Sequence, residues 1–308
     1  MHDIRLAIGL IGFLSVAAFF LVVRLLRDRS PHLQTSLALG IVITIFLYVE
    51  YVWDQLWIVK WIPLPSVIVL SNWFPIFLAG LGACVWLRFG QGRGRGLVVV
   101  GIILIAAIGS LFYFVAGGPP NCKSEWDYPR HTDEYVLHLQ TTPHTCSAAA
   151  AATLLGTVGV PATEGEMAEL CLTRSGSSFF GLPISPAGTT WLGLYHGMAS
   201  KLHGSGYRVV LFEGSTSQIE ELAKMHPVLL CCQLEPEMAE LLPQYVSEDG
   251  WIPGTSHSVV YLGRFRDGHH VGDPSRGWER WSDQDLELLW TGQGLRMLQV
   301  NPKRNSTD

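Results

Sequence analysis

The segment Leu139–Leu155, LQTTPHTCSAAAAATLL, places a single cysteine, Cys146, between a turn-forming Thr-Pro-His-Thr and a run of five alanines. Alanine is the strongest helix former and proline suits a first helical turn, so the segment predicts a helix that begins close to the cysteine. Unpaired amides and the macrodipole at such an end favour a thiolate. Cys146 is therefore a candidate nucleophile, the alternative being a cysteine that packs as a small apolar residue.

A thiol nucleophile needs a base, for which histidine is the usual choice. His257 begins the longest β-rich run of the soluble half, HSVVYLGRF, so a strand can anchor it while its ring faces a cleft. The turn signal Arg266-Asp-Gly268 predicts a hairpin whose second strand brings Asp273 back toward the same end of the sheet. There Asp273 can hold the tautomer of the imidazole. A regular hairpin leaves Asp273 a few residues away from His257, so contact requires a twist or a bulge.

Gln140 lies six residues before Cys146 and is a candidate side-chain donor to an oxyanion. The backbone N–H of Cys146 is the second candidate, and preorganised donors of this kind are worth about 3 kcal/mol each. Simpler readings exist for the other site residues too. His257 can be a surface histidine at a strand end, Asp273 a turn former before proline, and Gln140 an ordinary exposed glutamine.

The composition changes along the chain. Residues 1–118 carry eight Lys and Arg against four Asp and Glu, a net charge of +4, whereas residues 119–308 carry thirteen against twenty-two, a net −9. The whole chain has a mean hydropathy of +0.27 and only 15% charged residues. These features predict a transmembrane domain at 1–118, a linker at 119–130 and a soluble domain at 131–308. The soluble half has no basic patch, which excludes nucleic-acid binding.

Four apolar blocks are long enough to cross a bilayer, which needs roughly 20 residues, so we expect about four transmembrane helices. They are Leu6–Val23, Leu37–Trp53, Val67–Leu87 and Leu97–Val115. The first block is long and lacks a small-x-small cleavage site, so we expect a retained helix rather than a signal peptide. Because these blocks hold no paired charges, a transporter is disfavoured.

Arginines in the predicted loops give the orientation. Three follow the first apolar block and three follow the third, namely Arg24, Arg27, Arg29, Arg88, Arg93 and Arg95. Cytoplasmic loops are enriched in Lys and Arg, so both loops are expected to be cytoplasmic. The N-terminus and the soluble domain are then expected on the extracytoplasmic side of the membrane, and the lipid bilayer is a partner of the chain.

The soluble half predicts an α+β domain, because helical patterns come first and strands concentrate late. Helices are expected at Thr163–Leu172, Thr189–Leu202 and Thr216–Lys224, after the alanine-rich helix. Strands are expected at Tyr207–Phe212, Pro227–Gln233 and the hairpin described above. The segment Ser175–Gly188 is rich in Gly, Ser and Pro, and we expect it to form a loop.

The order Gln140, Cys146, His257, Asp273 resembles that of papain-like cysteine peptidases. The closer resemblance is to the bacteriocin-processing, double-glycine leader peptidases, in the segments HSVVYLG, VGDPSRG, GTTWLGLYHGMASKLHG and HPVLLCC. It spans most of residues 131–292. The resemblance implies a papain-like fold, a thiol peptidase acting on a peptide or protein substrate, a bacterial inner-membrane setting, and no cofactor.

Two features depart from that family. Its members usually have glycine directly after the cysteine, where this chain has Ser147, whose side chain can narrow the approach of a glycine-rich substrate. Its best-known members are cytosolic domains of export transporters with an ATPase on the same chain, whereas this sequence has no Walker-type glycine loop. The alternatives are therefore a catalytically silent papain-like binding or sensor module, and a transpeptidase or acyltransferase that uses the same thiol.

The other cysteines are interpreted as structural. Cys84 lies in the third apolar block, and Cys122 and Cys171 are able to form a disulfide in an oxidising compartment, which the sequence leaves open. A zinc site is disfavoured because the usual Cys-x-x-Cys spacing is missing. Its candidate ligands are Cys231, Cys232, His269 and His270.

Overall fold

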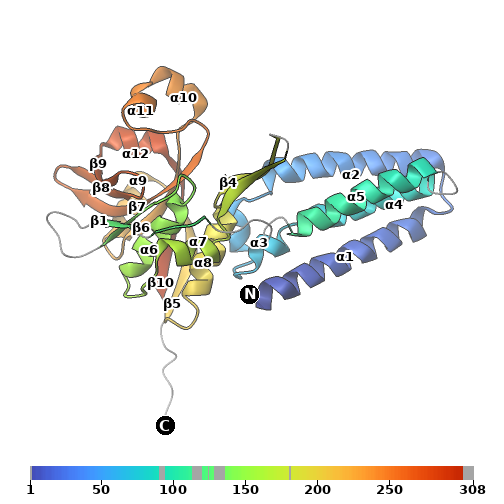
Figure 1. Ribbon diagram of the computed structural model, residues 1–308, viewed down its shortest axis with the longest axis horizontal. Coiled ribbons are helices and arrows are strands. Elements are labelled where there is room, and N and C mark those ends of the chain that lie inside the picture. The colour runs from blue at the N-terminus through green and yellow to red at the C-terminus, as the bar shows by residue number, and fades with distance from the viewer. Residues whose placement is uncertain are drawn as a thin grey trace, which may run out of the picture. The chain divides into compact units, whose positions relative to one another are not determined.

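The computed structural model describes residues 2–89, 94–112, 120–123, 125–127, 136–179 and 182–300. The chain forms two compact units, Met1–Ala116 and Gly117–Asp308 (Figure 1). The first unit is helical and the second combines helices with a sheet.

The first unit contains α1 (His2–Leu26), α2 (Pro31–Tyr51), η1 (Leu56–Lys60), α3 (Val67–Leu70), α4 (Phe74–Phe89) and α5 (Gly94–Phe112). Within the described residues, three segments are long and apolar enough to cross a membrane: Asp3–Leu26, Pro31–Tyr51 and Val67–Phe89. The fourth predicted span corresponds to α5, whose apolar part Gly96–Leu111 is shorter than the other three. Large apolar side chains such as Phe13, Phe20 and Phe46 are exposed on these helices, as expected where lipid is the solvent.

Residues 71–73 interrupt the third span between α3 and α4. The Tyr48 hydroxyl donates to the carbonyl of Ser71 at 2.5 Å, and Asn72 Nδ2 donates to the carbonyl of Ser110 on α5 at 2.8 Å. Backbone polar groups in an apolar environment must find partners within the protein, and these two side chains supply some of them. The interruption therefore links α2 and α5 to the third span.

The second unit is built on a six-stranded antiparallel sheet of order β5-β10-β6-β7-β8-β9. These strands are β5 (Tyr207–Glu213), β6 (Val228–Gln233), β7 (Ser256–Phe265), β8 (Gly268–Asp273), β9 (Gly277–Trp281) and β10 (Trp290–Gln299). Two hairpins lie outside it: β1 (Glu125–Asp127) with β2 (Leu137–Leu139), and β3 (Arg174–Phe179) with β4 (Leu182–Gly188). The helices are α6 (Cys146–Gly156), α7 (Glu164–Leu170), α8 (Trp191–Lys201), α9 (Thr216–Ala223), α10 (Pro236–Leu241), α11 (Gln244–Ser247) and α12 (Asp283–Leu289).

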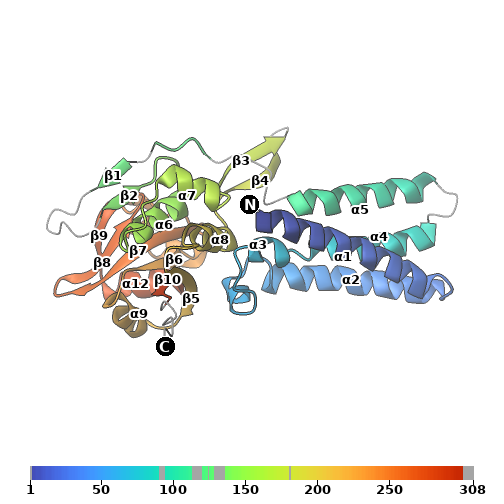
Figure 2. The same cartoon turned by 90° about the horizontal axis from the view of Figure 1, so that it is seen from below.

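Helices cover both faces of the sheet (Figure 2). Alternate residues of β7 face α6 on one side and the helices α9 and α12 on the other, because side chains along a strand point to opposite faces. Val259 and Tyr261 pack in a buried cluster with Ile219 of α9 and Leu286 of α12. The Ser258 hydroxyl faces the other way, toward α6. The α+β architecture is therefore as the sequence predicts.

The prediction of a loop at Ser175–Gly188 is wrong. The described residues of this segment form the β3–β4 hairpin, paired from Arg174 opposite Gly188 to Phe179 opposite Leu182. Glycine, serine and proline have low strand propensity, but a backbone ladder does not depend on side chains. A register shift between Ser177 and Ser178 and the positive φ of Gly176 (77°) accommodate the irregular sequence.

The β7–β8 hairpin contains the bulge that the sequence required. Gly263 pairs with His270, but Tyr261 pairs with Val271, so one extra residue lies in β7 between these pairs. Gly263 has φ +134°, which L side chains rarely adopt. Continuing the register beyond the pair Val260–Gly272 places Asp273 opposite Val259. Without the extra residue Asp273 would lie opposite Val260 and point to the other face.

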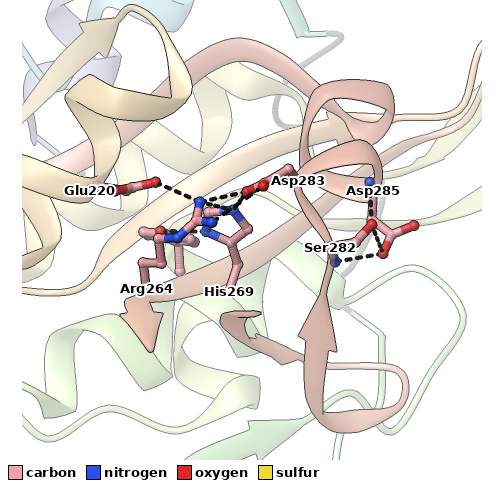
Figure 3. Close-up of polar contacts among 7 residues, drawn as sticks. Glu220, Arg264, His269, Ser282, Asp283 and Asp285 are labelled. Carbon is pink, nitrogen blue, oxygen red and sulfur yellow. Dashed lines mark hydrogen bonds and ion pairs between the residues drawn. The ribbon is translucent and has the colours of Figure 1, made fainter. Parts of the chain in front are cut away.

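A polar network anchors the turn end of this hairpin (Figure 3). His269 is 1% exposed, its Nδ1 lies 2.9 Å from the Tyr261 hydroxyl, and its Nε2 lies 2.8 Å from Asp283 Oδ1. Arg264 bridges Asp283 at 2.5 Å and Glu220 at 3.2 Å. These contacts join the hairpin to the start of α12 and to α9, so the hairpin is held at the end far from Asp273.

Replacement of Gly263 by alanine is expected to destabilise the soluble unit. A side chain at this positive φ is strained by about 1–3 kcal/mol, which corresponds to a fall of roughly 2–10 °C in thermal midpoint. The thermal midpoint is measured from the tryptophan fluorescence of the detergent-solubilised chain during thermal unfolding. Gly156→Ala is the matched control, because Gly156 has no neighbour within 4 Å and no positive φ. Equal midpoints for the two variants would contradict the role of the bulge.

Candidate active site

Cys146 is the first residue of α6, as the alanine run predicts. Ala148, Ala150 and Ala152 are fully buried, so the small side chains let the helix pack closely in the core of the unit. Thr145 occupies the N-cap position but makes no side-chain capping bond to the helix. The cysteine thus lies at a helix N-terminus whose first amides receive no hydrogen bond from the Thr145 side chain.

His257 and Asp273 are in contact. The Nε2 atom of His257 lies 2.9 Å and 3.0 Å from the two carboxylate oxygens of Asp273, whose side chain is 2% exposed. The ring of Trp251 packs edge-on against His257, with centroids 5.3 Å apart, and Trp251 is itself buried. Carboxylate and indole together fix the orientation of the imidazole.

Cys146 and His257 line the same cleft, and the His257 ring acts on the thiol. Since Asp273 occupies Nε2, the nitrogen that remains for the thiol is Nδ1. Burial opposes ionisation of Cys146, but the charge and hydrogen bond of His257 and the amide of Ser258 lower the pKa of the thiol below its ordinary value. Burial likewise opposes protonation of His257, but Asp273 and Cys146 raise the pKa of the imidazole well above 6.5. The pair therefore favours thiolate and imidazolium.

Asp273 stays ionised although it is buried. Burial raises the pKa of its carboxyl, and His257 and Ser275 overcome that effect and lower it below the ordinary value. Ser275 donates to Oδ1 of Asp273 with both its amide and its hydroxyl, each at 2.7 Å. An aspartate that accepts a hydrogen bond from the residue two positions later is a common turn arrangement. The sequence Asp-Pro-Ser could therefore have predicted that Ser275 donates to Asp273.

Gln140 lies in the same cleft as the other three predicted residues. Its backbone amide donates to the carbonyl of Pro274 at 2.8 Å, which ties it to the residue after Asp273. Its side-chain Nε2 donates one hydrogen to the carbonyl of Thr142 at 3.1 Å. An amide nitrogen carries two hydrogens, so the second remains to donate to a ligand.

The cleft brings together Gln140, Cys146, His257 and Asp273 with residues that sequence reasoning missed. Its other lining residues are Pro143, Asp249, Gly250, Trp251, Ile252, Thr255, Ser256 and Ser275. Most belong to the segment before β7, whose proximity to α6 depends on strand order rather than on any local pattern. Ile252 is largely exposed and gives the cleft an apolar rim.

Ser147 does not have the orientation that the sequence suggested. Its side chain is 4% exposed, and its hydroxyl lies 2.8 Å from the hydroxyl of Ser258 on β7 and 4.0 Å from Cys146 Sγ. A glycine in its place would lose this link between α6 and β7. The hydroxyl therefore turns toward the sheet and the thiol, where it supports the thiolate.

The remaining cysteines differ from Cys146. All six are free thiols, so Cys122 and Cys171 are not joined. Burial raises the pKa of Cys171 and Cys232, and burial with the nearby Glu164 raises that of Cys122 to about 11.

The zinc alternative placed His269 and His270 with Cys231 and Cys232. Instead, His269 is engaged by Tyr261 and Asp283, and His270 pairs with Asp267 at 2.9 Å. Among the described residues, no three His, Cys, Asp or Glu side chains gather in a way that could hold a metal ion.

No protein-family model and no curated protein matches the chain. Similar solved structures include the peptidase domain of Streptococcus ComA, a bifunctional ABC transporter of a quorum-sensing pathway (18% identity, TM-score 0.38, 52% of this chain and 94% of that one). The Streptococcus mutans ComA peptidase domain is another (17%, 0.31, 52% and 96%). A third is a double-glycine motif protease from an AMS/PCAT transporter in complex with its leader peptide (13%, 0.35, 56% and 97%).

These similar structures are double-glycine leader peptidase domains, the family that the sequence resembles. The chemistry of the cleft in this chain rests on its own side chains.

Alkylation is expected to find Cys146 reactive at pH values where an ordinary thiol is not, because its pKa is lowered by His257. In the His257→Ala variant the pH profile should move up toward the free-thiol value near 8.5, making labelling at pH 6 roughly 100-fold slower. Labelled residues are identified by mass spectrometry, with buried Cys171 as the internal control. A profile at Cys146 that His257→Ala leaves unchanged would contradict the ion pair.

Proposed function

We propose that the chain is a membrane-anchored cysteine peptidase in which Cys146 is the nucleophile. The observation that carries the proposal is the cleft that brings Cys146, His257, Asp273 and Gln140 together, with His257 bonded to Asp273 and the thiol at a helix N-terminus. A helix end, an imidazole and a buried carboxylate are the parts that nucleophilic thiol catalysis needs.

The Cys146 thiolate attacks the carbonyl carbon of a peptide bond and forms a carbon–sulfur bond. The oxyanion is stabilised by the second hydrogen of Gln140 Nε2 and by the backbone N–H of Cys146. His257 then donates its Nδ1 proton to the amine as the carbon–nitrogen bond breaks. In the second half, His257 takes a proton from water, the hydroxide attacks the acyl-enzyme, and the carbon–sulfur bond breaks to restore the thiolate.

Asp273 acts on the imidazole rather than on the substrate. Its carboxylate accepts from Nε2 and keeps Nδ1 turned to the thiol, while its charge stabilises the imidazolium that donates the proton. Ser275 holds the carboxylate and Trp251 shields one side of the ring. A solved relative captures a leader peptide, which supports a peptide or protein substrate for this cleft.

The proposed site lies on the extracytoplasmic side of a bacterial inner membrane. Support comes from the arginines in the α1–α2 turn, Arg27 and Arg29, and from Arg88 at the end of α4, since Lys and Arg are enriched on the cytoplasmic side. This arrangement suits the processing of secreted or membrane-associated peptides.

The second enzymatic reading, acyl transfer to an amine, uses the same acyl-enzyme and differs only in what attacks it. The silent binding module was favoured by Ser147, whose side chain turns toward Ser258 rather than across the cleft. The ionised pair Cys146–His257 favours catalysis over binding alone.

The pH dependence of kcat/KM is expected to be bell-shaped. Activity rises on the acid side as Cys146 loses its proton, at a pH below that of an ordinary thiol because its pKa is lowered. It falls on the alkaline side as His257 loses its proton, at a pH well above 6.5 because its pKa is raised. Cleavage of a quenched peptide library by the solubilised chain measures both limbs.

Cys146→Ala is the control for that assay and should remove the activity. Addition of an amine such as hydroxylamine separates the two enzymatic readings, because a transferase yields the amine adduct as its main product. A single ionisation near the ordinary imidazole value would contradict the thiolate–imidazolium pair. Binding of peptides without any turnover would support the silent module instead.

Labelling of Cys146 by a membrane-impermeant maleimide in intact cells is expected, because the soluble unit is proposed to be extracytoplasmic. Asp28→Cys in a Cys146→Ser background is the matched control, since Asp28 lies in the exposed turn after α1 and is proposed to be cytoplasmic. It should react only after the cells are opened. The reverse pattern would overturn the orientation and leave the chemistry of the cleft untouched.

A further inference from the structure

Glu164 is a buried carboxylate that the chemistry above does not use. It is the first residue of α7, where negative charge is favoured, and its side chain is fully buried. Three donors reach it: the Thr141 amide at 2.7 Å, the Thr141 hydroxyl at 2.8 Å and the Thr145 hydroxyl at 2.5 Å. A buried carboxylate is costly unless it is paired or well hydrogen-bonded, so these bonds fix the segment that it holds.

The segment that Glu164 holds joins two residues that line the cleft, Gln140 and Cys146. Thr141 directly follows Gln140, and Thr145 directly precedes Cys146. Thr141 and Thr145 are therefore both bonded to one carboxylate on a neighbouring helix. Between them the Thr145 hydroxyl also lies 3.0 Å from the carbonyl of Thr142, and that carbonyl accepts a hydrogen bond from Nε2 of Gln140.

Thr145 stands at the N-cap of α6, where a threonine hydroxyl normally accepts from a first-turn amide. Here it makes no such bond, and its oxygen lies 2.5 Å from Glu164 Oε1 instead. An amide that donates to a cap residue is no longer available to a thiolate or an oxyanion. The direction of one hydroxyl thus decides whether the start of α6 is capped or open.

We infer that Glu164 is a positioning residue of the cleft: it holds the Thr145 hydroxyl away from α6 and Thr141 beside Gln140, which leaves the amides of Ser147 and Ala148, those that a threonine cap would engage, open to the Cys146 thiolate. The inference rests on the proposed function and adds a residue outside the Gln140–Cys146–His257–Asp273 set. Glu164 touches neither the thiol nor the substrate and acts through Thr145 and Thr141.

The experiment compares Glu164→Ala with the double variant Glu164→Ala/Thr145→Val in the full-length solubilised chain. Removal of the carboxylate frees the Thr145 hydroxyl to cap α6. Alkylation of Cys146 at pH 6 should then fall about tenfold, and kcat/KM by a similar factor, because the capped amide no longer stabilises the thiolate. The double variant has no hydroxyl with which to cap, so most of the alkylation rate should return. A merely structural role for Glu164 predicts the opposite, because two core substitutions disturb the fold more than one.

Glu166→Ala is the matched control, since Glu166 lies on the same helix and pairs with Lys201 at the surface. Glu164→Gln retains an acceptor for Thr145 and should lose less than Glu164→Ala. If Glu164→Ala does not fold, as judged by circular dichroism, the Glu164→Gln variant with and without Thr145→Val gives the same comparison with a smaller effect of the same sign.

Each outcome has one meaning. An activated Cys146 in the parent with equal alkylation in Glu164→Ala overturns the role of Glu164 and leaves the proposed function standing. A double variant as slow as Glu164→Ala also overturns it, because the hydroxyl is then not responsible. An ordinary thiol profile in the parent itself overturns the proposed function, and with it the role of Glu164.

Discussion

The contact between the His257 ring and the Asp273 carboxylate depends on the bulge in β7, and the rest of the cleft is arranged around that contact. The bulge moves Asp273 from a position opposite Val260 to one opposite Val259, on the same face of the hairpin as His257. With Nε2 engaged, Nδ1 faces Cys146 at the start of α6. The network of His269, Arg264 and Asp283 holds the far end of the same hairpin, so the register is fixed from both ends.

Helix α6 places Cys146 beside the hairpin that carries His257 and Asp273. Its alanines allow a close approach to the rest of the core, and the hydroxyl pair of Ser147 and Ser258 joins its first turn to β7 beside His257. The backbone of Ser258 on the strand lowers the pKa of the Cys146 thiol, which lies at the N-terminus of α6. Charge at Cys146 is therefore stabilised by two elements that are distant in sequence.

Much of this arrangement could be predicted from the sequence, because it depends on residues that are neighbours in the chain. An alanine run after Thr-Pro-His-Thr specifies the start of α6, and a β-rich run before a turn specifies the hairpin, so Cys146 and His257 were identifiable from neighbouring residues. The parts that could not be predicted depend on pairing between distant segments. The bulge site at Gly263 and the insertion of β10 between β5 and β6 leave no periodic signal. The hairpin at Ser175–Gly188 was missed because its strands have the composition of a loop.

The place of β10 has a consequence for the order of folding. Strands β5 and β6 pair with each other only through β10, the last strand of the described chain, and Gly294 lies where any side chain would meet Leu229 and Phe212. The hairpin and α6 are formed from local contacts and can fold early, whereas closure of the sheet awaits residues 290–299 and a long-range pairing that slows folding. During synthesis, the parts of the cleft are present before the sheet that supports them is complete. A nascent chain would therefore complete the surroundings of Cys146 late, after the last strand has emerged.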